Sequence, residues 1–189
     1  TWGPQTWRLL VAVSRRYDDL VPQGVRAEAH MLRRRRRAVA EVMRELPLTL
    51  VHGDTHRGNI CFVGDRPILF DWQVAAQGPG VKDLAYFAVT SLDTDVRHRI
   101  EQELLAEYLE ALQAHGGPRL AREPIWADYR MLAVTAFIAA GVTSAFGARL
   151  QGEAVTRTGL DRAVRAVQDL GSFTELWRRV GQRLSLIHI

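Results

Sequence analysis

The chain has 189 residues, of which 47% are hydrophobic, and this length and composition suit one globular domain with a sizeable core. Its formal charge of +4 comes from an excess of arginine and is only a weak indication of anionic partners. The single cysteine excludes an internal disulfide and no secretory signal is evident, so we expect a cytoplasmic protein.

Two helices are predicted in the first part of the chain. Residues 5–20 carry apolar residues at helical spacing, and residues 24–46 form a second helical pattern that Pro47 stops. The second pattern contains Arg33 to Arg37, and these five residues cover more than one turn, so they cannot share one face. No aromatic residue interrupts them, which favours a solvated surface over nucleic-acid binding and leaves open a basic rim for an anionic substrate.

A turn-rich segment with polar side chains follows, and a hairpin comes directly after it. Residues 59–63 and 68–70 are short β-prone runs separated by a turn of hairpin length. The hairpin is expected to bring Asp54 and Asn59, near the start of its first strand, towards Asp71, at the end of its second strand. Two carboxylates and an amide oxygen then share a small volume, and such oxygen ligands suit Mg²⁺.

The spacing Asp-x-x-x-x-Asn from Asp54 to Asn59 matches the catalytic loop of protein kinases. In that loop the aspartate orients the substrate hydroxyl and the asparagine holds a magnesium ion. Asp71 falls where a further metal-binding aspartate is expected. Cys61 lies in the first predicted strand, so we expect a buried thiol there.

The order and spacing of three segments resemble those of the aminoglycoside phosphotransferase and choline kinase superfamily, including its ecdysteroid-kinase-like branch. The segments are His52-Gly53-Asp54-Thr55-His56-Arg57-Gly58-Asn59, Phe70-Asp71-Trp72-Gln73 and Gly80-Val81-Lys82-Asp83-Leu84-Ala85-Tyr86-Phe87. The resemblance implies a protein-kinase-like α+β fold. Within it, this chain would be a mainly α C-terminal lobe with a small β-hairpin, and residues 48–73 would form its catalytic loop and metal-binding hairpin.

The resemblance also implies roles for individual residues. Asp54 would be the catalytic base, and Asn59 and Asp71 would bind the Mg²⁺ that accompanies ATP. His52 and Asp83 would support the loop; Asp83 also suits the positive end of the helix that it opens. For His56, two roles stay open: contact with a phosphate group, or a hydrogen bond within the loop.

Two departures from the protein-kinase pattern bear on function. Gly53 stands where protein kinases have an arginine that reads a phosphorylated activation loop, and Trp72-Gln73 replaces Phe-Gly, so we expect a small-molecule kinase. No Gly-rich phosphate loop and no strand lysine precede His52. We therefore expect residues 1–184 to be the C-terminal lobe of a longer enzyme, without its N-terminal nucleotide lobe and with negligible turnover alone. The acceptor alcohol is not identified.

Five helices are predicted after the hairpin: residues 83–92, a helix opened by Asp93-Thr94-Asp95 and closed by Gly116-Gly117-Pro118, and residues 124–146, 160–170 and 172–184. Four-residue steps in the second of these predict one core face, formed by Val96, Ile100, Leu104, Tyr108 and Leu112. The helix over residues 124–146 is only marginally hydrophobic, so a buried central helix is favoured over a membrane span.

The end of the chain gives two further predictions. Ser172 and Glu175 have the spacing of a capping box. Residues 185–189 break the surrounding composition, and we interpret them as a tail, a sequence-end artefact without a function.

Two other functions stay open. His52, Asp54 and His56 are candidate ligands of a two-metal phosphoesterase, although the remaining histidines lack paired spacing. A kinase-like fold can also serve as a catalytically silent binding or regulatory module. The presence of Asp54 together with Asn59 and Asp71 favours the phosphotransferase.

Overall fold

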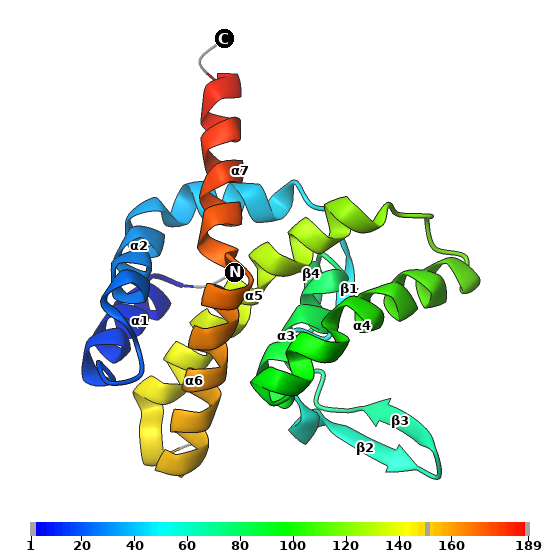
Figure 1. Cartoon of the computed structure of the whole chain (residues 1–189), viewed down its shortest axis with the longest axis horizontal. Coiled ribbons are helices and arrows are strands. Elements are labelled where there is room, and N and C mark those ends of the chain that lie inside the picture. The colour runs from blue at the N-terminus through cyan, green and yellow to red at the C-terminus, as the bar shows by residue number, and fades with distance from the viewer. Residues whose placement is uncertain (1–2, 150–151, 188–189) are drawn as a thin grey trace.

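The computed structural model describes residues 3–149 and 152–187, and helices make up most of this part of the chain (Figure 1). The helices are α1 (Pro4–Arg16), α2 (Gln23–Arg44), α3 (Val81–Ser91), α4 (Thr94–Ala114), α5 (Arg122–Phe146), α6 (Glu153–Asp169) and α7 (Ser172–Ile187), with short 3-10 turns η1 (Arg57–Asn59) and η2 (Gly147–Arg149). The strands are β1 (Thr49–Val51), β2 (Ile60–Val63), β3 (Arg66–Leu69) and β4 (Ala76–Gly78). The prediction of a mainly α chain is confirmed.

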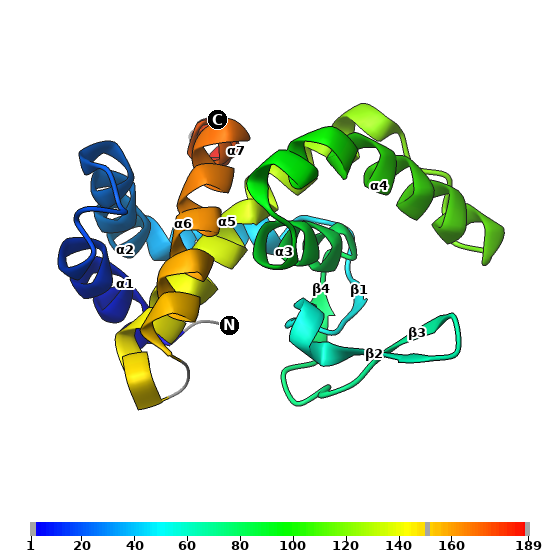
Figure 2. The ribbon, with the colours of Figure 1, turned by 60° about the horizontal axis from the view of Figure 1, so that its bottom comes forward.

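The strands form two separate antiparallel pairs. β2 and β3 make the predicted hairpin, with Ile60 opposite Leu69, and the hairpin projects from the helical body (Figure 2). The second pair was not predicted; in it β1 and β4 align Val51 with Ala76. Each of these strands has only three residues, and β4 runs into a Gly-Pro-Gly segment that is typical of a loop.

Helix α5 is the centre of the core. It packs against α1, α3, α6 and α7 (Figure 1), and 13 of its 25 residues are buried. By length and composition it is the one helix in the described ranges that could cross a membrane, but 61% of its apolar window is buried inside the protein. The prediction of a buried central helix is confirmed.

The predicted core face of α4 is correct only at Tyr108, which packs against the core. Val96, Ile100, Leu104, Tyr108 and Leu112 are only partly buried, and the buried residues lie one position further on, at Arg97, Glu101 and Leu105. The inner side of α4 is partly ionic: the Arg97 guanidinium bonds Glu101 at 2.8 Å and Asp169 of α6 at 2.7 Å. Apolar spacing therefore did not reveal the buried face, because charged residues that pair with each other occupy it.

Two predictions for the last helices need correction. Helix α6 begins at Glu153, before the predicted start at residue 160, and α7 continues to Ile187. The predicted tail thus lies partly in a helix, and residues 188 and 189 lie outside the described residues.

The predicted capping box at the start of α7 was also wrong. Within the described residues the buried Ser172 Oγ has no hydrogen-bond partner. Glu175 instead accepts hydrogen bonds from Arg178 and Arg179. The turn before α7 is made by Gly171, whose φ of 58° favours glycine.

The hairpin leaves apolar side chains open to solvent, and the prediction for Cys61 was wrong because this cysteine is exposed. Phe62 is 69% exposed, and Ile68, Phe70 and Trp72 are exposed as well. A β-prone run is buried only where another layer of the structure covers it. In the described ranges no other helix or strand packs extensively on β2 or β3. The hairpin register places Phe62 on one face and Ile68 and Phe70 on the other, and Phe70 lies beside the polar loop described next.

Candidate active site

Residues 52–59, named the catalytic loop after the role predicted for them, connect β1 to β2 and are held by the first turn of α3. The Asp83 carboxylate accepts hydrogen bonds from the backbone N–H of His52 at 2.6 Å and of Gly53 at 3.0 Å. The Thr55 hydroxyl donates to the Asp83 carbonyl oxygen at 2.7 Å. One residue of α3 thus fixes three successive parts of the loop, while its carboxylate also lies at the positive end of the helix.

His52 links the catalytic loop to the far end of the hairpin. Its ring is 1% exposed, and Nδ1 accepts the Asp54 N–H at 3.3 Å. Nε2 lies 2.8 Å from the Phe70 carbonyl oxygen, so Nε2 carries the proton and donates it there. The ring also contacts Trp72, with the ring centroids 4.7 Å apart.

The Asp54 carboxylate is bonded at both oxygens. Tyr86 donates its hydroxyl hydrogen to Oδ1 at 2.8 Å. Asn59 Nδ2 donates to Oδ2 at 3.3 Å and to the Asp54 carbonyl oxygen at 2.9 Å. The Asp54 side chain is nevertheless 31% exposed, so a substrate can reach a carboxylate whose direction is set by the protein.

Residues 70–74, named the metal loop after the role predicted for Asp71, follow β3. The Phe70 N–H donates to the Asn59 carbonyl oxygen at 3.1 Å, which ties this loop to the end of the catalytic loop. Asp71 has a φ of 63°, in the left-handed region that non-glycine residues rarely adopt. Its exposed carboxylate has one weak contact in the described chain, a 3.4 Å bond from Gln73.

Gly53 is required where the two loops touch. Its φ is +87°, and a Cβ placed there would lie 2.8 Å from the Val74 carbonyl oxygen. Any larger residue would be strained in its backbone and would also push the metal loop away.

The three residues predicted to share a volume are thus brought together in part. Asp54 and Asn59 are in direct contact, and Asp71 lies one residue beyond Phe70, without a hydrogen bond to either side chain in the described residues. Nor do the described ranges hold a cluster of three or more His, Cys, Asp or Glu side chains arranged for a metal ion.

The donors that are present fit Mg²⁺ with few protein ligands. Asn59 is 6% exposed and its amide nitrogen is engaged with Asp54, so the amide oxygen is the atom left for a cation. Asp71 adds an exposed carboxylate. Mg²⁺ usually takes one or two carboxylates and fills its other positions with water and phosphate oxygens.

The histidines of the loop argue against a two-metal phosphoesterase. His52 is buried and uses both ring nitrogens within the protein, so it has no lone pair for a metal. His56 Nδ1 accepts the Gly58 N–H at 3.0 Å, a bond of the second of the two kinds that the sequence left open, and Nε2 lies 3.5 Å from Asp54 Oδ2.

Two residues near Asp54, Tyr86 and Lys82, had no predicted role. Burial and the neighbouring Asp54 carboxylate raise the pKa of Tyr86. Burial lowers the pKa of Lys82, the only lysine, against the opposing effect of Asp83 and Asp54. A signal for Tyr86 was available, because it follows Asp83 by three residues and so lies on the same face of the helix.

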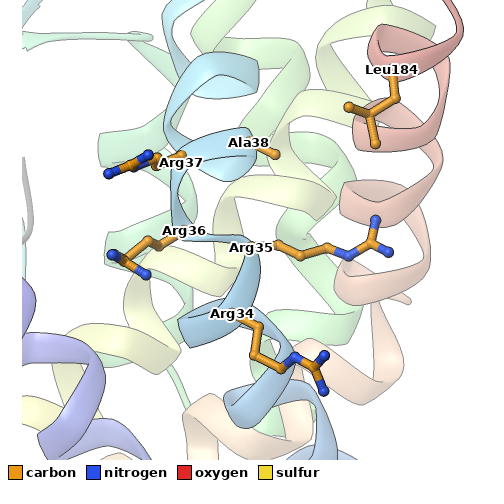
Figure 3. Close-up of a pocket in the computed structure, with 6 residues that line it drawn as sticks. All are labelled: Arg34, Arg35, Arg36, Arg37, Ala38 and Leu184. Atoms are coloured by element: carbon orange, nitrogen blue, oxygen red, sulfur yellow. The ribbon is translucent and has the colours of Figure 1, made fainter.

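A cavity of about 550 Å³ lies elsewhere, against α2 and α7 (Figure 3). It is lined by Arg34, Arg35, Arg36, Arg37, Ala38 and Leu184. Helix α2 departs from helical geometry at Arg35, and Figure 3 shows Arg34 and Arg35 pointing towards α7 while Arg36 and Arg37 point away from it. The prediction that these arginines cannot share one face is confirmed, and none of the lining residues belongs to the two loops.

Comparison with known proteins shows a family match. A family model described as the phosphotransferase enzyme family matches residues 1–130, a range that contains the catalytic loop, the metal loop and α3. No curated protein and no solved structure matches the chain.

Proposed function

Because the chain belongs to the phosphotransferase enzyme family, we propose that it transfers the γ-phosphoryl group of ATP to a hydroxyl group of a small molecule, within a kinase-like fold. The observation that carries this proposal is the Asp54 carboxylate, which Tyr86 and Asn59 hold by its two oxygens while it stays accessible. A carboxylate held in this way is suited to receive a proton from an alcohol.

In the proposed reaction the acceptor oxygen attacks the γ-phosphorus of ATP. The hydroxyl proton passes to Asp54, the bond between the γ-phosphorus and the bridging β–γ oxygen breaks, and ADP and a phosphate ester leave. Phosphoryl transfer requires mainly positioning and stabilisation of charge, so the fixed direction of Asp54 is the main contribution of the catalytic loop.

Asn59 and Asp71 are the residues that would hold Mg²⁺. When bound, Mg²⁺ neutralises charge on the ATP phosphates. Asn59 offers an amide oxygen from a buried position. Asp71 offers a carboxylate, and its backbone has the left-handed conformation that is often found at functional sites. We assign His56 to the loop rather than to a phosphate, on the basis of its bond to the Gly58 N–H.

The exposed apolar face of the hairpin supports a nucleotide as one substrate. On one face of the hairpin, Ile68 is 41% exposed and Phe70, directly before Asp71, is 44% exposed. An apolar face of this kind beside polar groups is typical of a ligand-binding surface, and an adenine ring can cover it.

The test is Asp54→Asn in the whole protein, with Asp65→Asn in the exposed hairpin turn as the matched control. Loss of a general base is expected to lower kcat by at least ~10²-fold. ATP-dependent phosphorylation of candidate alcohols, followed by release of ADP, gives the rates. A near-wild-type rate for Asp54→Asn refutes the assignment, whereas Asp65→Asn should retain full activity.

A further inference from the structure

We infer that Tyr86 is a positioning residue for Asp54, and that its hydroxyl turns the carboxylate towards the acceptor alcohol. This inference rests on the proposed function, because it gives Tyr86 a part in the same reaction. Tyr86 does not touch the reacting atoms itself but acts through the carboxylate that does.

The position of Tyr86 in the fold supports this role. It lies on α3 and is 8% exposed, and its hydroxyl is 2.8 Å from Asp54 Oδ1. Asp83, three residues earlier on the same helix, binds the backbone at the start of the catalytic loop. One helix therefore fixes both the path of the loop and the direction of its acidic side chain.

The contacts on the two carboxylate oxygens are complementary. Tyr86 donates to Oδ1 and Asn59 donates to Oδ2, so rotation of the Asp54 side chain would break both bonds. Each carboxylate oxygen has a second lone pair, which leaves room for the proton of an incoming hydroxyl. Asn59 is also a proposed magnesium ligand, whereas the only role proposed for Tyr86 at the site is its hydrogen bond to Asp54.

The hydroxyl of Tyr86 remains a donor under ordinary conditions. Burial and the Asp54 carboxylate both raise its pKa, so the phenol keeps its proton. If Tyr86 served only to fill the core, its ring would suffice, and phenylalanine would replace it without effect. Removal of the hydroxyl alone thus separates a positioning role from a packing role.

Kinetics of Tyr86→Phe in the whole protein provide the first test. We expect kcat to fall about tenfold or more, as for loss of a hydrogen bond to a charged group, with the KM for ATP within about twofold of wild type. In an Asp54→Asn background the same substitution should have no further effect. Tyr129→Phe is the matched control, since it also removes a buried hydroxyl bonded to a carboxylate, that of Glu101, outside the site.

The outcomes separate this inference from the proposed function. If Asp54→Asn keeps the wild-type kcat, the proposed function fails. If Asp54→Asn loses activity and Tyr86→Phe keeps it, the positioning role of Tyr86 is overturned.

A second measurement needs no turnover. The ¹³C resonance of the Asp54 carboxyl group, recorded at one pH, should shift in Tyr86→Phe, while the resonance of Asp71 should stay in place. An unmoved Asp54 resonance overturns the inference even if no acceptor alcohol has been found, and a shift confined to Asp54 supports it.

Discussion

The two loops of the site are built in opposite ways. The catalytic loop is tied to α3 through Asp83, and His52 within it is buried with both ring nitrogens engaged. The metal loop is held mainly at Phe70, and beyond it Asp71 is exposed with a single weak contact in the described residues. The fold itself thus sets the direction of the Asp54 carboxylate, whereas in the described residues it leaves the Asp71 carboxylate with few constraints.

The largest expected difference between the loops is in stability. Asp83→Asn should lower the free energy of unfolding by about 2–3 kcal/mol, since an amide nitrogen would face a backbone N–H that now donates to a carboxylate. The same change at Asp71 should cost less than about 0.5 kcal/mol, because its carboxylate is exposed. Urea denaturation measures both, and equal losses would show that the loops do not differ.

Glycine substitutions probe the contact between the loops. Gly53→Ala should cost about 2 kcal/mol, since its φ is +87° and its Cβ would meet the Val74 carbonyl oxygen. Gly64→Ala at the hairpin turn is the control, with a φ of +60° and nothing within 4 Å of the new Cβ. It should cost about 1 kcal/mol in the same denaturation experiment. A smaller loss at Gly53 than at Gly64 would contradict the close packing of the two loops.

At Asp71 one substitution is expected to raise the stability of the fold and to lower the activity. Asp71→Gly should raise the free energy of unfolding by about 0.5 kcal/mol, because glycine adopts the φ of 63° without strain. The same variant should lose Mg²⁺-dependent transfer, measured as kcat over a range of MgCl₂ concentrations. Unchanged activity in Asp71→Gly would remove Asp71 from the proposed magnesium site.

The smallest expected effect is a change in the pKa of Lys82, which the neighbouring carboxylates influence. Burial lowers its pKa, while Asp83 and Asp54 raise it, so Asp54→Asn should lower it further. Asp71→Asn should leave it unchanged. ¹³C-methylation of the amino group gives one lysine NMR signal, because the chain has one lysine, and titration of that signal measures the pKa. An equal change of the Lys82 pKa in Asp71→Asn and in Asp54→Asn would indicate that the two carboxylates lie at the same distance from the Lys82 amino group.

Features with a strong local signal were predicted from the sequence. The apolar spacing of α1, the apolar composition of α5, the proline after α2 and the turn between β2 and β3 are all local, and these elements were predicted close to their observed positions. The order of the motifs between residues 50 and 87 led to the phosphotransferase family. Local patterns were sufficient where neighbouring residues determine the outcome.

Features that depend on distant contacts were missed. The pairing of β1 with β4 joins two segments of three residues that lie before and after the two loops. The buried face of α4 depends on Asp169, which lies on another helix. The exposure of Cys61 depends on what covers the hairpin. Helical spacing places Tyr86 on the same face as Asp83, but its role depends on the contact of α3 with Asp54.

The exposed hairpin has a practical consequence for spectroscopy. Cys61 is the only cysteine of the chain and lies exposed on β2, two residues after Asn59. A maleimide dye added to the unmodified protein would therefore attach at a single place, next to the proposed nucleotide surface. Quenching or depolarisation of that dye would report directly on whether a nucleotide arrives there, with no engineered labelling site.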